Sequence, residues 1–513
     1  MWPSVTFHAD HQKRVAADKR AQKQLVPTRS HCSSRQLGDQ LNRQSTQSVN
    51  KSRRALRQSR RASTVAKGLR KFGDHGESIA CLGRKKKSSK QRRGASPKLE
   101  VWRPGVDPLD EGEELQYEPS AYDTIHAFRL GWPCLSFDIL RDELGALRHE
   151  FPLTLFCTAG TQAAKPADNR LIVAKLTNIS GKKRGVELAA SDDGDSSSSS
   201  SDESDDEEMS DKTPKLEVRM IAHHGCINRI RSMPQEPNII ATWSETGVVQ
   251  IWDVKSLLQE LSSGNAGSSS RIAHQAPLQV FSGHEVEGFA LDWSLAHQGW
   301  LASGDNNGVI HVWQPNRREW IVGGRALVGH SSSVEDLQWC PTLDPFRLAS
   351  CSSDGTLRLW DVPTCTCTAM WKIHDADVNV ISWRSDSVLA SGGDDGIIYL
   401  WNLKHLKDGP IWMTNYHSAP ITSIEWSPHD SSMLAATSAD NQLSVWDFSV
   451  EADPEEEAQV KQSVAAPKGL PESLLFVHQG QRDLKELHWH PQLLGTIVST
   501  SFSDFNVFKP SNL

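Results

Sequence analysis

Histidine, serine and aspartate recur together in the C-terminal half of this 513-residue sequence, and these three types can perform nucleophilic acyl transfer. Each set ends in tryptophan. The sets are His330, Ser350, Asp354 and Trp360; His374, Ser391, Asp395 and Trp401; and His417, Thr437 or Ser438, Asp440 and Trp446. An enzyme needs such a set once. We therefore interpret each set as a buried structural tetrad whose polar groups satisfy one another, and we predict no enzymatic activity and no cofactor.

The spacing of these sets indicates a tandem repeat of the WD40 type. Aromatic residues close six successive units at positions 252, 313, 360, 401, 446 and 508, so the steps are 61, 47, 41, 45 and 62 residues. This agrees with a blade period of about 40–45 residues plus loop insertions. The 18 Trp against 4 Tyr fit one structural position that takes Trp repeatedly. Four-stranded blades of this kind cover their faces by stacking around an axis.

The residues before the repeats are expected to close the ring. Strand-length apolar runs at 134–178 supply a seventh blade beside the last one. Upstream of them, Ser120 is a suitable cap with Asp123 three residues later, which predicts a helix over Ser120–Leu130. The fold class is therefore all-β, a seven-bladed WD40 propeller with an N-terminal helix and a disordered basic N-terminal tail.

Charge divides the chain into parts of opposite sign. Residues 1–98 hold 25 Lys and Arg against 5 Asp and Glu, a net charge of +20, and the remainder carries −27. We predict a disordered basic extension over 1–98, a lead-in segment, helix and ring-closing strands over 99–190, an acidic Ser/Asp/Glu linker over 191–211, and WD40 repeats over 212–513. The acidic body should attract basic proteins, and the tail should attract nucleic acid.

The basic extension contains a dense cluster that could act in nuclear targeting or in RNA contact. Its residues are Arg84, Lys85, Lys86, Lys87, Lys90, Arg92 and Arg93. A solvated tail without a partner is the alternative. The nine scattered Cys indicate reduced thiols, and Cys365 and Cys367 lack the further ligands that a zinc site needs. No apolar run is long enough to predict a membrane-spanning helix.

At this point the sequence resembles a known family. The segment Ser120–Asp142, with Phe151-Pro152 and Gly160–Ala163, resembles the N-terminal region of histone-binding WD40 proteins and, more closely, of the glutamate-rich WD-repeat proteins. The stretch Leu474–Asn506 and the acidic linker are similar to the same family. The resemblance covers roughly residues 99–513 and does not extend to 1–98.

The resemblance implies a groove for a basic helix of the client protein, between the predicted helix Ser120–Leu130 and an acidic loop at Glu451–Leu475. An amphipathic helix beside carboxylates would suit such a client, whereas packing on the propeller is the alternative role for the same side chains. The predicted groove residues are Tyr122, Ile125, His126, Phe128, Arg129, Asp453, Glu455, Glu456, Glu457, Pro471, Glu472, Leu474 and Leu475.

Three functions for the predicted scaffold remain open. The first is escort of a large-subunit ribosomal protein in ribosome biogenesis, which implies a nuclear and nucleolar location. The second is a histone-binding chromatin or replication factor. The third is a substrate receptor of a cullin ubiquitin ligase, for which Trp252-Asp253-Val254-Lys255 resembles the docking motif, with Lys in place of Arg. Both clients of the first two functions are basic, so charge alone does not choose between them.

Overall fold

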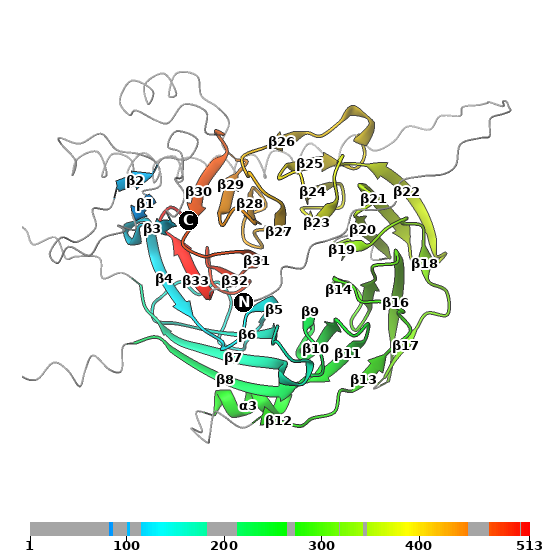
Figure 1. The fold of residues 1–513 in the computed structure, drawn as a ribbon, viewed down its shortest axis with the longest axis horizontal. Helices are drawn as coiled ribbons and strands as arrows, with labels where there is room; N and C mark the ends of the chain where they lie inside the picture. The colour runs from blue at the N-terminus through cyan, green and yellow to red at the C-terminus, as the bar shows by residue number, and fades with distance from the viewer. Residues whose placement is uncertain are drawn as a thin grey trace, which may run out of the picture. The chain divides into compact units, whose positions relative to one another are not determined.

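Seven β-sheets stand around one axis and form a closed propeller, as the sequence predicted (Figure 1). The computed structural model describes residues 82–85, 100–102, 114–181, 213–263, 272–317, 319–341, 346–449, 471–502 and 504–513. The predicted disordered state of the tail and the acidic linker lies outside the described residues. The linker position falls inside a blade, because it follows one strand of that blade and precedes the next.

The blades are numbered from the first inner strand, and each runs from the axis outward. Blade 1 has β5 (Cys134–Leu140), β6 (Leu153–Thr161), β7 (Arg170–Ile179) and β8 (Lys215–Ala222), with β12 (Ile272–Ala273) added in parallel. Blade 2 has β9 (Ile227–Met233), β10 (Glu236–Ser244), β11 (Val249–Asp253) and β13 (Gln279–Phe281). Blade 3 has β14 (Ala290–Trp293), β15 (Leu301–Gly304), β16 (Val309–Asn316), β17 (Glu319–Val322) and β18 (Leu327–Val328).

Blade 4 has β19 (Val334–Trp339), β20 (Arg347–Ser352), β21 (Thr356–Asp361) and β22 (Thr366–Lys372). Blade 5 has β23 (Val378–Trp383), β24 (Val388–Gly393), β25 (Ile398–Asn402) and β26 (Trp412–Thr414). Blade 6 has β27 (Ile421–Trp426), β28 (Met433–Ser438), β29 (Leu443–Asp447) and β30 (Leu474–His478). Blade 7 has β31 (Leu484–Trp489), β32 (Ile497–Ser501), β33 (Phe505–Pro510) and, outermost, β4 (Tyr122–Phe128).

Strand β4 corrects the predicted N-terminal helix. Residues Tyr122–Phe128 are extended and pair antiparallel with β33, from Tyr122 opposite Pro510 to Phe128 opposite Phe505. Only a 3-10 turn, Pro119–Ala121, precedes the strand, and Glu118 rather than Ser120 caps it. The N-terminal segment therefore completes the last blade, and the propeller is closed by strands from both ends of the repeat region (Figure 1).

Two further features were not predicted. Within the stretch expected to be disordered, β1 (Leu82–Lys85) pairs with β2 (Glu100–Trp102) and β3 (Glu114–Tyr117) in a small sheet. Among the described residues the one α-helix is α3 (Lys255–Ser262), between β11 and β13, with Leu257 and Leu261 buried. Neighbouring blades lie very close, since a Cβ on Gly160 would meet the Ile227 side chain at 2.4 Å.

The connections define two faces of the ring. The loop before the first strand of each blade and the turn between its second and third strands lie at one end of the blade. We call this end the tetrad face. The turns between first and second strands, and between third and fourth strands, lie at the opposite face.

Candidate functional site

The predicted tetrad residues of blades 4 and 5 lie within hydrogen-bonding distance of one another. In blade 4, Trp360 Nε1 donates to Ser350 Oγ at 2.8 Å, and Ser350 lies 2.7 Å from His330 Nε2. The other ring nitrogen of His330 lies 3.0 Å from Asp354. Blade 5 repeats this with His374, Ser391, Asp395 and Trp401, and blade 3 repeats it with His284, Ser303, Asp305 and Trp313.

This geometry explains why a His-Ser-Asp set does no acyl chemistry here. Ser350 is fully buried and its oxygen already accepts the indole N–H, so no substrate carbonyl can approach it. Burial lowers the pKa of His330, although Asp354 opposes the shift, so the imidazole is neutral and Nδ1–H donates to the carboxylate. The set ties the loop before the first strand to the turn between the second and third strands.

Blade 6 takes its hydroxyl from a residue that the sequence reading missed. His417 Nε2 lies 2.8 Å from Ser444 Oγ, and Trp446 Nε1 donates to the same oxygen at 2.8 Å. Neither Thr437 nor Ser438 holds this place: Thr437 bonds to Thr422, and Ser438 donates to a backbone carbonyl. The prediction of Thr437 or Ser438 is therefore wrong, while Asp440 does contact His417 at 3.0 Å.

A second tryptophan position, on the inner strands, accounts for much of the Trp excess. The indole N–H of each such Trp donates across to a backbone carbonyl of the preceding blade at 3.0–3.2 Å. The five are Trp293, Trp339, Trp383, Trp426 and Trp489. The sequence reading assumed one Trp position, although the Trp that ends the first strand of most repeats was visible in the sequence.

A buried charge cluster joins the blades where the ring closes. Glu486 of β31 is 1% exposed and accepts Arg229 Nη1 at 2.7 Å and Arg231 Nη2 at 2.8 Å, both from blade 2. It also accepts the backbone N–H of Phe137 in blade 1. Although burial raises it, the pKa of Glu486 is held well below its usual range by these cations. The pKa of His488 rises to about 10, because Glu425 and Glu486 outweigh the effect of burial.

Other inner-strand carboxylates lack cations of their own. Asp292 of blade 3 accepts the backbone N–H of Trp339 at 2.8 Å, and Asp336 of blade 4 accepts that of Ile381 at 3.1 Å. Burial raises the pKa of Asp292 to about 7 and raises that of Asp336, while Arg231 and Arg229 only partly oppose the shifts. The inner strands therefore carry more carboxylate than the local cations neutralise.

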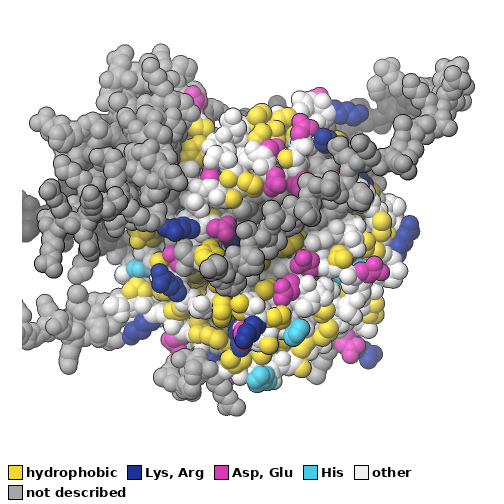
Figure 2. Space-filling model, viewed as in Figure 1, with side chains coloured by type: hydrophobic (Ala, Val, Ile, Leu, Met, Phe, Trp, Pro, Cys, Tyr) yellow, Lys and Arg dark blue, Asp and Glu magenta, His cyan; other side chains and the backbone are white. Residues whose placement is uncertain are grey.

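The acid excess continues onto the tetrad face. Glu335 lies at the start of β19, Asp377 precedes β23 and Asp394 follows β24, so all three lie at that end of the blades. Burial and the mutual repulsion of these carboxylates raise the pKa of Glu335 and of Asp377. On the face turned to the viewer in Figure 2, Asp and Glu side chains show around the middle, while most visible Lys and Arg side chains lie toward the rim. Such a surface favours a cationic partner.

The predicted groove residues fall into three groups. Tyr122 is buried, its OH lies 2.8 Å from His478 Nδ1, and Ile125 and Leu475 pack in the same cluster. Phe128 packs in a different cluster, and Leu474 packs against the core of blades 5 and 6. Tyr122 and Phe128 are thus core residues of blade 7. Asp453, Glu455, Glu456 and Glu457 lie outside the described residues, while Pro471 and Glu472 lie just before β30.

The strand geometry separates other predicted residues from this group. Arg129 follows β4 and lies about 20 Å along the strand from Tyr122, because a strand rises about 3.3 Å per residue. His126 Nε2 lies 3.0 Å from the backbone oxygen of Ser180. The helix of the predicted groove is therefore absent, and its residues do not share one face.

Two other sequence features have limited structural description. In the basic cluster, Arg84 and Lys85 belong to β1, and Lys86, Lys87, Lys90, Arg92 and Arg93 lie outside the described residues. In the motif considered for a cullin ligase, Trp252 is buried and donates to Thr242, while Lys255 is exposed at the start of α3.

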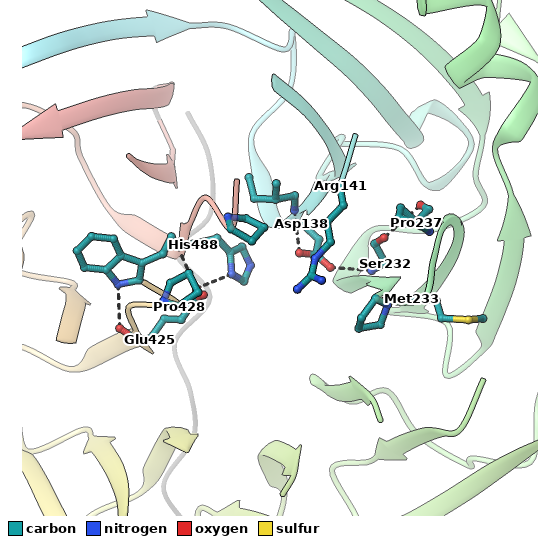
Figure 3. Close-up of a pocket in the computed structure, with 12 residues that line it drawn as sticks. Asp138, Arg141, Ser232, Met233, Pro237, Glu425, Pro428 and His488 are labelled. Carbon is teal, nitrogen blue, oxygen red and sulfur yellow. Dashed lines mark hydrogen bonds and ion pairs between the residues drawn. The ribbon is translucent and has the colours of Figure 1, made fainter. Parts of the chain in front are cut away.

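The opposite face carries a pocket of about 170 Å³ near the axis, between blades 1, 2, 6 and 7 (Figure 3). Asp138 accepts the backbone N–H of Ser232 at 2.7 Å on one side, and His488 Nδ1 lies 2.8 Å from Glu425 on the other. Within the described part of the chain, no group of three or more His, Cys, Asp and Glu is placed to hold a metal. No described helix is long and apolar enough to cross a bilayer.

The fold and its charge define a class of protein: a WD-repeat propeller with an acidic face and no exposed nucleophile set among the described tetrads. Comparison agrees with this class. The family model for histone-binding protein RBBP4 and its counterpart in the CAF1 complex matches residues 112–180. The model for the WD domain, G-beta repeat, matches residues 324–361, 365–402 and 410–447.

Relatives of known name place the chain more closely. Glutamate-rich WD repeat-containing protein 1 of Dictyostelium discoideum is 43% identical over 80% of this chain and 85% of its own length. The ribosome assembly protein rrb1 of Schizosaccharomyces pombe is 37% identical over 82% and 86%, and the protein HEAT STRESS TOLERANT DWD 1 of Arabidopsis thaliana is 48% identical over 84% and 96%. The chain belongs to the glutamate-rich WD-repeat family of ribosome-biogenesis proteins, which is related to histone-binding WD40 proteins.

Proposed function

We propose that this protein is a non-catalytic escort for a basic client, a large-subunit ribosomal protein, in the nucleus and nucleolus. The observation that carries the proposal is the uncompensated carboxylate on the inner strands and the tetrad face, where burial raises the pKa of Asp292, Glu335 and Asp377. A cationic segment bound there would stabilise the ionised carboxylates. The printed name of the relative rrb1, a ribosome assembly protein, supports the choice of process.

The acidic stretches of the sequence would extend this surface. The linker 191–211 lies between β7 and β8 of blade 1, and the acidic loop lies between β29 and β30 of blade 6. Basic clients of ribosome assembly must be kept from nonspecific polyanions until rRNA takes them over, and carboxylates can mask them in the interval. We retain Asp453, Glu455, Glu456 and Glu457 as proposed contacts, with Ile125 and Leu475 as the apolar residues nearest to the loop.

Affinity purification of the tagged full-length chain from cells at moderate salt, followed by mass spectrometry, tests the client. One large-subunit ribosomal protein recovered in stoichiometric amount with assembly factors supports the proposal. Core histones with chromatin factors in its place would overturn the ribosomal client, and cullin-ligase subunits as the main partners would overturn the escort function.

Direct binding of the recovered client tests the site. The double variant Glu335→Gln, Asp377→Asn should weaken binding at least 5-fold at low salt, because attraction between opposite charges on the tetrad face is lost. Glu319→Gln, on the outer strand β17 of blade 3, is the matched control and should bind like the wild type. Equal affinity of the double variant and the control would contradict this placement of the site.

A further inference from the structure

A second pocket opens on the tetrad face where blades 7 and 1 meet. It has a volume of about 150 Å³ and lies between the loop that leads from β4 to β5 and the turn between β32 and β33. Its lining includes Arg129, Trp132, Thr500, Phe502 and Asp504. This pocket is on the same face as the acidic residues of blades 4 and 5, so a client bound to that face can reach it.

Two large aromatic side chains of the pocket are exposed: Trp132 is 45% exposed and Phe502 is 65% exposed. Their loops are held in place. The backbone N–H of Phe502 donates to the Arg482 carbonyl at 3.1 Å, and that of Gln162 donates to the Pro133 carbonyl beside Trp132 at 2.8 Å. Aromatic side chains presented on ordered loops are frequent centres of binding energy in protein interfaces.

Hydrogen-bond acceptors lie beside the aromatic rings. Asp504 accepts Gln481 Nε2 at 3.0 Å and Ser501 Oγ at 3.2 Å, both on Oδ1, and Oδ2 accepts no hydrogen bond from the described residues. Thr500 is 1% exposed, and its hydroxyl has no hydrogen-bond partner within the described part of the chain. A ligand that brings N–H donors would satisfy both oxygens. Arg129 is the cation in the lining, so Asp504 must outweigh it for a cationic ligand.

We infer that this pocket takes one Lys or Arg side chain of the basic client, with its aliphatic stem against Trp132 and Phe502 and its head on Asp504. Aromatic faces attract ammonium and guanidinium groups, and the carboxylate supplies the counter-charge. The inference rests on the proposed function and adds a specific anchor to the diffuse attraction of the acidic face.

The test measures binding of a fluorescein-labelled peptide, six Lys-Gly repeats, to the full chain at low salt by fluorescence anisotropy. Trp132→Ala, Phe502→Ala and Asp504→Asn should each weaken binding about 3- to 10-fold, by loss of stacking or of the counter-charge. Asn keeps the Oδ1 acceptor, so the turn should stay intact. Arg129→Ala should strengthen binding, because a like charge is removed. Ile321→Ala, an exposed apolar residue on β17, is the matched control and should bind like the wild type.

Unchanged binding in both Phe502→Ala and Asp504→Asn, with equal melting temperatures, would overturn this inference and leave the proposed function intact. Weaker binding in Arg129→Ala would also overturn it, since it would mean an acidic occupant. If the wild-type chain binds neither this peptide nor a basic ribosomal protein, the proposed function fails and the inference fails with it.

Discussion

Ser444 shows that the hydroxyl of a propeller tetrad can come from either of two paired strands. In blade 4 the hydroxyl is on the second strand, at Ser350, whereas in blade 6 it is on the third, at Ser444. Ala436 occupies the position equivalent to Ser350, and it is the strand partner of Ser444. The hydroxyl reaches the same place between histidine and indole because paired residues lie side by side on one face of the sheet.

Replacing Ser444 with Ala should destabilise the protein by about 1–3 kcal/mol, because the indole N–H of Trp446 loses its buried acceptor. Adding Ala436→Ser to this variant should recover most of the loss, since it restores the arrangement of blades 4 and 5. Thermal unfolding of the two variants and the wild type measures both effects. No recovery in the double variant would contradict the equivalence of the two positions.

Buried histidines should limit stability on the acid side. Burial lowers the pKa of His284, His330 and His374 below the ordinary value near 6.5, so the folded state binds fewer protons than the unfolded state below that pH. Their contribution is present above pH 6.5 and is lost as pH falls, by up to about 1.4 kcal/mol per pH unit for each histidine. Denaturant unfolding at pH 7, 6 and 5 checks this. A stability that is flat over this range would contradict neutral buried imidazoles.

His488 should give the opposite dependence. Its pKa is raised to about 10, so its contribution is fully present below the unfolded pKa near 6.5 and is lost as pH rises toward 10. The same unfolding series extended from pH 7 to 9.5 should therefore decline in the wild type. His488→Gln should lower stability at pH 7 and flatten this alkaline decline, leaving the acid side unchanged.

At the scale of elements, β4 explains where reading the sequence fails. Tyr122, Thr124, His126 and Phe128 alternate as a strand requires, but Tyr122, Ile125 and Phe128 also fit a helical period. Seven residues are too few to separate the two periods. The deciding factor is the partner β33, which lies more than 370 residues away in the sequence and offers a free sheet edge. The repeats themselves were predictable because each carries its own turn and its closing Trp.

Strand β4 should be necessary for a stable ring. Deleting residues 1–129 removes buried Tyr122 and Phe128, and the loss of each such aromatic costs about 3–5 kcal/mol. We expect this variant to be aggregated or to unfold at much lower temperature, because the edge of β33 is left unpaired. Deleting only residues 1–111 keeps β4 and should leave a cooperative unfolding transition. Equal melting temperatures of the two deletions would contradict the role of β4.

At the scale of the whole molecule, charges placed far apart in the sequence meet at the axis. Glu486 from blade 7 binds Arg229 and Arg231 from blade 2 across Phe137 of blade 1. Sequence reading found the acidic body, since net charge can be counted, but it could not place the inner-strand carboxylates. Their position depends on ring closure, which brings residues more than 250 positions apart into contact. The predicted groove relied on local acidic runs for the same reason.

Client binding should therefore release protons. Asp292 has a pKa of about 7, and burial also raises the pKa of Glu335 and Asp377, so part of this carboxylate is protonated near neutral pH. A bound cationic segment favours the ionised form and lowers these pKa values, so affinity should rise from pH 6 to pH 8 and fall with added salt. Calorimetric titration of the client at pH 6.5, in buffers of different ionisation enthalpy, counts the protons. The double variant Glu335→Gln, Asp377→Asn should release fewer, and Glu319→Gln should match the wild type. Proton uptake on binding would mean that the client does not approach these acids.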